Sequence, residues 1–144
     1  MASPLYLLDT NILVHSVRLD ATWSRIRGEY QLLLIDPTPI ISIVTVGEIR
    51  SLALQWTWGP AKLDRMAFAL DYFDVVPVED PVLVDKYAEI DAHFQTRGRK
   101  LGKNDLWIAA TALRFDARLL TTDRDFDALD PLFLKRDWIL ARPV

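Results

Sequence analysis

Four acidic residues border apolar segments that lie far apart in the sequence: Asp9, Glu48, Asp105 and Asp123. Carboxylates that are held close together repel one another and partly protonate, and a divalent cation removes that cost. Hard ions such as Mg²⁺ or Mn²⁺ accept carboxylate oxygens as ligands, activate water and stabilise the charge of a phosphoryl transition state. If the fold brings these acids together, the sequence predicts a metal-dependent site for phosphoryl chemistry.

The segments around these acids indicate strands that alternate with helices. Strands are predicted at residues 4–9, 40–44, 74–78 and 117–123, and a fifth at 138–144. Helices are predicted at residues 10–18, 21–35, 45–56, 61–73, 82–97 and 103–113. Because the strands are short continuous apolar runs, we predict an α/β fold with a central parallel sheet of four to five strands, flanked by helices on both faces. No repeat or linker interrupts residues 1–144, so we expect one domain.

Ligands of such sheets bind at the carboxyl ends of the strands, near the point where the strand order reverses. Asp9 and Asp123 end predicted strands, Glu48 follows one within the first turns of a helix, and Asp105 begins a helix. All four are therefore expected at the same edge. The alternative for Asp9 and Asp105 is a helix N-cap, but Ser or Thr would serve that role equally well. The joint pattern favours ligands.

Composition narrows the class of protein. The 144-residue chain has no cysteine, which excludes disulfides, thiolate zinc sites and thiol catalysis. The N-terminal segment lacks the basic start of a signal peptide, and no apolar run reaches the ~20 residues of a membrane span, so we expect a soluble, cytoplasmic protein. The net charge of −3 disfavours a general nucleic-acid coat, but it permits an enzyme that holds a polyanion through metal ions and a local basic patch.

Four motifs in order resemble those of PIN-domain ribonucleases, and most closely the VapC toxins of bacterial toxin–antitoxin pairs. They are LLDTN at 7–11, SIVTVGEI at 42–49, GKNDLWIAATAL at 102–113 and LLTTDRDFDAL at 119–129. The resemblance spans nearly the whole chain. It implies a Mg²⁺- or Mn²⁺-dependent endoribonuclease that cuts RNA, is silenced by a small antitoxin protein and forms a homodimer.

The resemblance also implies roles for the acids. Asp9 and Asp105 would be the chief metal ligands, and Glu48 and Asp123 would complete the cluster, directly or through water. The fourth position is the least defined, because the segment TTDRDFD offers three aspartates. Members of the family sometimes carry Asn at the position of Asp123. Asp125 is the alternative to Asp123, while Asp127 is expected on the surface.

Other polar residues have candidate supporting roles. Asn11 and Thr121 are predicted to hydrogen-bond the acids, although each is equally suited to local backbone contacts. A basic segment precedes Asp105 and is a candidate for holding flanking phosphates, with a solvated loop as the alternative; its residues are Arg97, Arg99, Lys100 and Lys103. The two histidines, His15 and His93, lie in no ligand pattern, so neither zinc nor a histidine base is expected.

Two other functions remain open from the sequence. A catalytically silent PIN-like module would bind RNA or protein without cutting, but it would not need the full set of acids. A Mg²⁺-dependent phosphatase or phosphate receiver is disfavoured, because position 11 is Asn where an aspartyl phosphatase needs Asp, and the lysine of a receiver is missing.

Trp56 and Trp58 could anchor a partner or close the core, and the core is favoured.

Overall fold

Five short strands pair in parallel in the computed structural model, which describes residues 3–141. They are β1 (Tyr6–Leu8), β2 (Ile40–Ser42), β3 (Asp74–Val76), β4 (Arg118–Thr121) and β5 (Arg136–Trp138). Their order in the sheet is β3-β2-β1-β4-β5. The chain thus moves outward from β1 to β3 and then crosses to β4 on the other side of β1. This reversal places a crevice at the carboxyl ends of β1 and β4.

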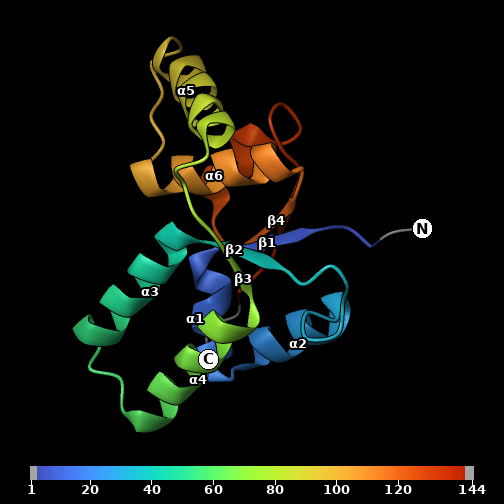
Figure 1. Cartoon of the computed structure of the whole chain (residues 1–144), viewed down its shortest axis with the longest axis vertical. Coiled ribbons are helices and arrows are strands. Elements are labelled where there is room, and N and C mark those ends of the chain that lie inside the picture. Colours follow the sequence, from blue (N-terminus) through green and yellow to red (C-terminus); the bar gives the residue numbers. More distant parts are fainter. Residues whose placement is uncertain (1–2, 142–144) are drawn as a thin grey trace.

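Helices cover both faces of the sheet, as Figure 1 shows. They are α1 (Thr10–Arg18), α2 (Ala21–Tyr30), α3 (Ile43–Gln55), α4 (Pro60–Tyr72), α5 (Pro81–Gln95) and α6 (Lys103–Phe115), and a 3₁₀ helix, η1 (Arg124–Leu129), follows β4. Buried residues of α1 to α4 form one core cluster, and those of α5, α6 and η1 form the other. The two clusters lie on opposite sides of the strands.

Successive strand residues contribute to opposite core clusters. In β1, Leu8 packs with the α1–α4 cluster, whereas Leu7 packs with the α5–α6 cluster, and both are fully buried. Leu120 and Leu119 of β4 divide in the same way. Side chains of a strand alternate between faces, so a sheet covered on both sides requires continuous apolar runs. This explains why the strands lack polar alternation, and the predicted fold class is confirmed.

Several predicted boundaries were wrong. Residues 43–44 were predicted as strand, but the Ser42 hydroxyl accepts a hydrogen bond from the Val44 amide at 3.1 Å and starts α3 at Ile43. The second helix was predicted to reach residue 35, but it ends at Tyr30 because Gln31 adopts a left-handed conformation (φ 55°).

The fifth strand lies earlier than predicted. The prediction covered residues 138–144, whereas β5 spans Arg136–Trp138 and pairs with β4, with Trp138 in register with Thr121. Residues 139–141 continue without strand structure, and the predicted strand residues 142–144 lie outside the described residues.

The strand order also bears on the phosphate-receiver alternative. A receiver has the order 2-1-3-4-5, with the third strand in the middle of the sheet. Here β3 is an edge strand, and Asp80 beyond it caps α5 and pairs with Arg114 at 2.6 Å. The receiver hypothesis therefore fails on topology.

Among the described residues, no helix has the length and apolar character that crossing a membrane requires.

Candidate metal centre

The carboxyl ends of β1 and β4 bring the predicted acids to one edge of the sheet. Asp9 follows β1 and caps α1, and Asp123 follows β4 and caps η1. Glu48 lies in the second turn of α3, and Asp105 is the third residue of α6. The four acids come from four segments of the sequence.

Three of the acids at this edge offer oxygen atoms to a common point. One carboxylate oxygen from each of Asp105, Asp123 and Asp125 lies within 4.8 Å of the other two. Oxygen ligands of a single Mg²⁺, each about 2.1 Å from the ion, are separated by about 3 to 4 Å. The all-oxygen donor set suits a hard divalent cation, and the 4.8 Å limit lies just above the ligand separations around one ion. Both Asp123 and its alternative Asp125 belong to this cluster.

Asp9 lies behind this cluster and is almost completely buried, with 5% of its surface exposed. Its Oδ1 accepts a hydrogen bond from the Thr10 amide, and its Oδ2 accepts one from the Thr121 hydroxyl, both at 2.8 Å. Each carboxylate oxygen has two acceptor positions, so these bonds leave room for a metal. They fix the orientation of Asp9 without adding a positive charge.

Thr10 also holds the side chain of Glu48. The Thr10 hydroxyl donates to Oε1 of Glu48 at 2.7 Å, and it also lies 3.1 Å from the buried Thr45 hydroxyl. Thr10 thus contacts two of the predicted acids, one through its amide and one through its side chain. Thr10 was not predicted as a site residue, although its place between Asp9 and Asn11 in the LLDTN motif was the available signal.

Burial and mutual repulsion raise the pKa values of two acids. Burial raises the pKa of Asp105 to about 7, and the negative charges of Asp9, Asp123, Asp125 and Glu48 add to this effect. Burial likewise raises the pKa of Asp9 to about 6, although the hydrogen bonds from Thr121 and Thr10 oppose it. The charges of Glu48 and Asp123 raise the pKa of Asp9 further. All five acids therefore interact within one electrostatic site.

Within the described part of the chain, no basic side chain forms an ion pair with any of these five acids. Among residues 3–141, Asp105 has no hydrogen-bond partner for its side chain, and the cap of α6 is Gly102, not Asp105. The interpretation of Asp105 as an N-cap was wrong. A half-buried carboxylate with no protein donor, surrounded by like charges, is a strong site for an external cation.

Of the other predicted site residues, some contact the acids and others do not. Thr121 contacts Asp9 as described, whereas Asn11 is exposed and, in the described residues, has no hydrogen bond to Asp9. A role for Asn11 stays a prediction. The Arg97 guanidinium folds back onto the carbonyl of His93 at 2.9 Å, at the end of α5. Lys103 is exposed at the first position of α6.

Two hollows flank the acidic cluster. One, of about 490 Å³, lies between α3 and α6 and has Glu48 and Asn104 in its wall. The other, of about 280 Å³, lies between the loop before α6 and η1, where Arg99 and Lys100 face Asp125. The acids therefore lie between two open recesses, and the second recess has basic residues in its wall.

Comparisons with known proteins identify the family. A family model described as PIN domain matches residues 6–131. Ribonuclease VapC5 of Mycobacterium tuberculosis (strain ATCC 25618 / H37Rv) is 32% identical over 99 residues, which cover 67% of this chain and 73% of the relative.

Solved toxin–antitoxin structures share the fold. VapBC-5 from Mycobacterium tuberculosis has a TM-score of 0.67 at 25% identity and covers 96% of this chain and 100% of its own. VapBC2 from Rickettsia felis, bound to a DNA fragment from its promoter, has a TM-score of 0.79 at 20% identity and covers 94% and 98%. VapBC-1 from nontypeable Haemophilus influenzae has a TM-score of 0.75 at 23% identity and covers 93% and 97%.

We expect Asp105→Asn to stabilise the metal-free protein near neutral pH. An acid whose pKa is higher in the folded chain binds its proton more tightly when folded, so its contribution to stability falls as pH rises from about 4 to about 7. The gain at pH 7.5 should be about 1 kcal/mol, or roughly 3–5 °C in Tm, because solvent and counter-ions screen a half-buried carboxylate.

Thermal melts with chelator at pH 4.5 and pH 7.5 measure this effect. The difference between Asp105→Asn and the wild type should be largest at pH 7.5. Asp85→Asn, which alters an exposed acid of α5, is the matched control and should show no pH-dependent difference. An equal Tm difference for Asp105→Asn at both pH values would contradict the electrostatic explanation.

Proposed function

This chain belongs to the PIN-domain family, whose model matches residues 6–131, and on that premise we propose that it is a metal-dependent endoribonuclease and the toxin of a toxin–antitoxin pair. The resemblance predicted from the four motifs is confirmed by the family model and by the VapC5 ribonuclease relative. The predicted domain bounds of 1–144 extend beyond the matched residues and stay a prediction.

One observation supports nuclease activity above the others. Five carboxylates meet at the crevice between β1 and β4, and no basic side chain of the described chain pairs with them. A stable domain has no structural use for such a cluster, because burial and repulsion both oppose it. A divalent cation held by oxygen ligands removes this cost. We propose Mg²⁺ or Mn²⁺, since both accept carboxylates and retain water.

The cation would be held by Asp105, Asp123 and Asp125. The buried carboxylate of Asp9 would add negative charge near the cation. When bound, the cation supplies Lewis-acid activation of water and neutralises charge on the phosphoryl group. Thr10 and Thr121 orient Asp9 through neutral donors, so its negative charge stays available. Glu48 accepts a hydrogen bond from the Thr10 hydroxyl and lines the α3–α6 hollow, and in this proposal it would accept a proton from the attacking water.

The two hollows suggest a path for the substrate across the acids. A single RNA strand could extend from the α3–α6 hollow to the hollow at Arg99 and Lys100, with its scissile phosphate over the cluster. The lysine and arginine would hold a flanking phosphate, which carries affinity but no sequence information. The two recesses together favour a strand of several nucleotides over a single nucleotide.

The alternative of a catalytically silent PIN-like module is less well supported. Such a module could bind RNA through the basic loop alone, and the acids would then only weaken its stability and its attraction for RNA. Here all four predicted acids reach one edge, and Asp125 joins them. Their number and their lack of ion pairs within residues 3–141 favour the enzyme.

Asp9→Asn and Asp105→Asn should each lower the rate of RNA cleavage in Mn²⁺ or Mg²⁺ by at least 100-fold, because each removes a charge that supports the cation. The measurement is cleavage of an RNA pool by purified protein, with chelator as the negative condition and circular dichroism to verify folding. Asp85→Asn is the matched control and should cut at the wild-type rate. Wild-type rates in either site variant would refute the assignment.

Charge reversal in the basic loop should weaken RNA binding with little effect on the chemical step. Arg99→Glu combined with Lys100→Glu should raise KM by about 10-fold or more and leave kcat within a few-fold, because in this proposal these two residues of the hollow would contact flanking phosphates. Arg97→Glu is the control, since its guanidinium is directed to α5 and away from the hollow. A kcat loss with unchanged KM would contradict this role.

The toxin role implies a partner protein, which the VapBC relatives contain. An apolar groove of about 340 Å³ between α1, α2 and α4 is suited to an apolar segment of an antitoxin. Leu19 and Phe68, each 58% exposed, border it, and the buried Phe73 contributes to its lining. Exposed apolar patches of this kind commonly mark protein interfaces. A homodimer stays a prediction.

Phe68→Glu should therefore weaken antitoxin binding by at least 10-fold and leave RNA cleavage unchanged, because the groove lies on the helices of one face and the acids lie at the sheet edge. The binding partner is the cognate antitoxin, and affinity is measured by calorimetry. Val84→Glu, an exposed apolar position on α5 that is 41% exposed, is the matched control. Equal antitoxin affinity in Phe68→Glu and the wild type would exclude the groove.

A further inference from the structure

The segment that carries Asp123 and Asp125 is anchored by the last strand of the sheet. Trp138 ends β5 and stands in register with Thr121, and the amide of the next residue, Ile139, donates to the Thr121 carbonyl at 2.8 Å. This pairing fixes Trp138 beside the start of residues 122–125, called the acidic segment below. Trp138 lies near the opposite end of the sequence from Asp9 and was not predicted to have a functional role.

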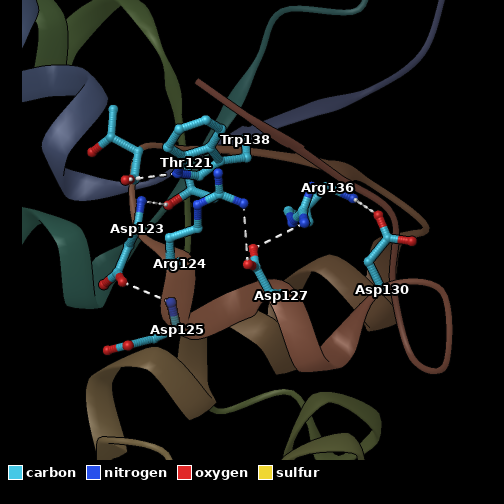
Figure 2. Close-up of polar contacts among 9 residues, drawn as sticks. Thr121, Asp123, Arg124, Asp125, Asp127, Asp130, Arg136 and Trp138 are labelled. Carbon is cyan, nitrogen blue, oxygen red and sulfur yellow. Dashed lines mark hydrogen bonds and ion pairs between the residues drawn. The ribbon is translucent and has the colours of Figure 1, made fainter. Parts of the chain in front are cut away.

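Trp138 contacts the acidic segment on both sides of Asp123. Its indole N–H donates to the Thr122 carbonyl at 3.1 Å, and the guanidinium carbon of Arg124 lies 3.5 Å from the centre of its ring. Figure 2 shows Arg124 lying against Trp138, while the side chain of Asp123 extends in a different direction. The backbone before Asp123 and the side chain after it are therefore both held by one residue.

Arg124 is flanked by two acids of the cluster, yet its guanidinium does not pair with either. It pairs instead with Asp127 at 3.3 Å, and Asp127 is held in turn by Arg136 at 2.9 Å. The Arg136 amide donates to Asp130 at 3.0 Å, which ties this network to the end of η1 and the start of β5 (Figure 2). The network directs the positive charge of Arg124 away from the metal centre.

This direction matters because an arginine beside two carboxylates is their natural partner. A bidentate arginine–carboxylate pair is strong, and it would occupy the oxygens that a cation needs. The flat face of Trp138 offers the guanidinium an alternative position through a cation–π contact. The indole bond to Thr122 meanwhile restrains the backbone from which Asp123 extends.

We propose that Trp138 is a positioning residue of the metal centre: its indole N–H and its ring hold the Asp123–Asp125 segment in ligand geometry and keep Arg124 off the two carboxylates. This inference rests on the proposed function, since it assumes that the acids hold a divalent cation. It adds to that function a determinant of metal affinity, contributed by β5, that touches neither the cation nor the substrate.

The experiment measures Mn²⁺ binding to the full chain by calorimetry, independently of RNA cleavage. Trp138→Ala removes both contacts and should weaken Mn²⁺ binding by roughly 10-fold or more, as is usual when a residue that orients metal ligands is lost. Trp138→Phe keeps the ring for Arg124 but loses the N–H, so its affinity should lie between those of Trp138→Ala and the wild type. This second variant preserves most of the packing if the alanine variant does not fold.

Trp56→Ala is the matched control. Trp56 is also a half-exposed tryptophan with an arginine over its ring, since Arg18 lies 5.2 Å from the ring centre, but it lies at the end of α3. Its loss should leave Mn²⁺ affinity unchanged. In cleavage assays, Trp138→Ala should need about 10-fold more Mn²⁺ for half-maximal rate and should approach the wild-type rate at saturating Mn²⁺.

Wild-type Mn²⁺ affinity in folded Trp138→Ala and Trp138→Phe would overturn the proposal, even if the wild type cuts RNA as expected. A loss of cleavage that saturating Mn²⁺ does not restore would also overturn it, because a purely structural defect behaves in that way. Failure of the wild type to bind Mn²⁺ would overturn both this inference and the metal-dependent function. The three results are distinguishable in one set of titrations.

Discussion

The close approach of five carboxylates without a protein cation is the constraint on which the rest of the molecule depends. Asp9 and Asp105 are partly removed from water, and their pKa values rise to about 6 and about 7. The other features of the site hold the carboxylates in place against this repulsion. The scaffold must therefore be stable enough to hold the acids before a cation arrives, and the two core clusters on either side of the strands supply that stability.

Neutral hydrogen-bond donors hold the acids in place. The Asp125 amide donates to Asp123, the Asp123 amide donates to the Thr121 hydroxyl, and that hydroxyl donates to Asp9. The bonds, each 2.8 to 2.9 Å long, form a continuous chain from η1 through β4 to β1. Hydroxyls and amides orient a carboxylate but leave its charge, whereas lysine or arginine would neutralise it. Arg124, the basic residue that interrupts this chain in sequence, is directed to Trp138 and Asp127.

The sequence predicted those parts of the site that follow from local patterns. Asp9 and Asp123 end apolar runs, and parallel strands place such ends at one edge, so their meeting could be expected. The sequence offered Asp125 only as the alternative to Asp123. That both join the cluster could not be predicted, because it depends on the tight turn of η1, in which the Asp125 amide donates to Asp123. The role of Trp138 could not be predicted for another reason. The register of β5 against β4 is a tertiary contact, and the apolar run that predicted the strand begins at Trp138, which is the last residue of β5. The alternative of Asp105 as a cap came from its place at the start of a predicted helix, but α6 begins two residues earlier and its cap is Gly102.

In the proposed metal centre, protonation, metal binding and folding would be coupled, because all three act on the same carboxylate oxygens. Near neutral pH the metal-free site retains part of a proton among Asp105 and Asp9, since their raised pKa values lie close to that range. A cation must displace this proton, so its apparent affinity rises with pH until both acids are ionised. The same ionisation destabilises the metal-free fold. The conditions that weaken the empty domain are therefore those under which it binds its cation best, and the bound form gains stability by mass action as the metal concentration rises.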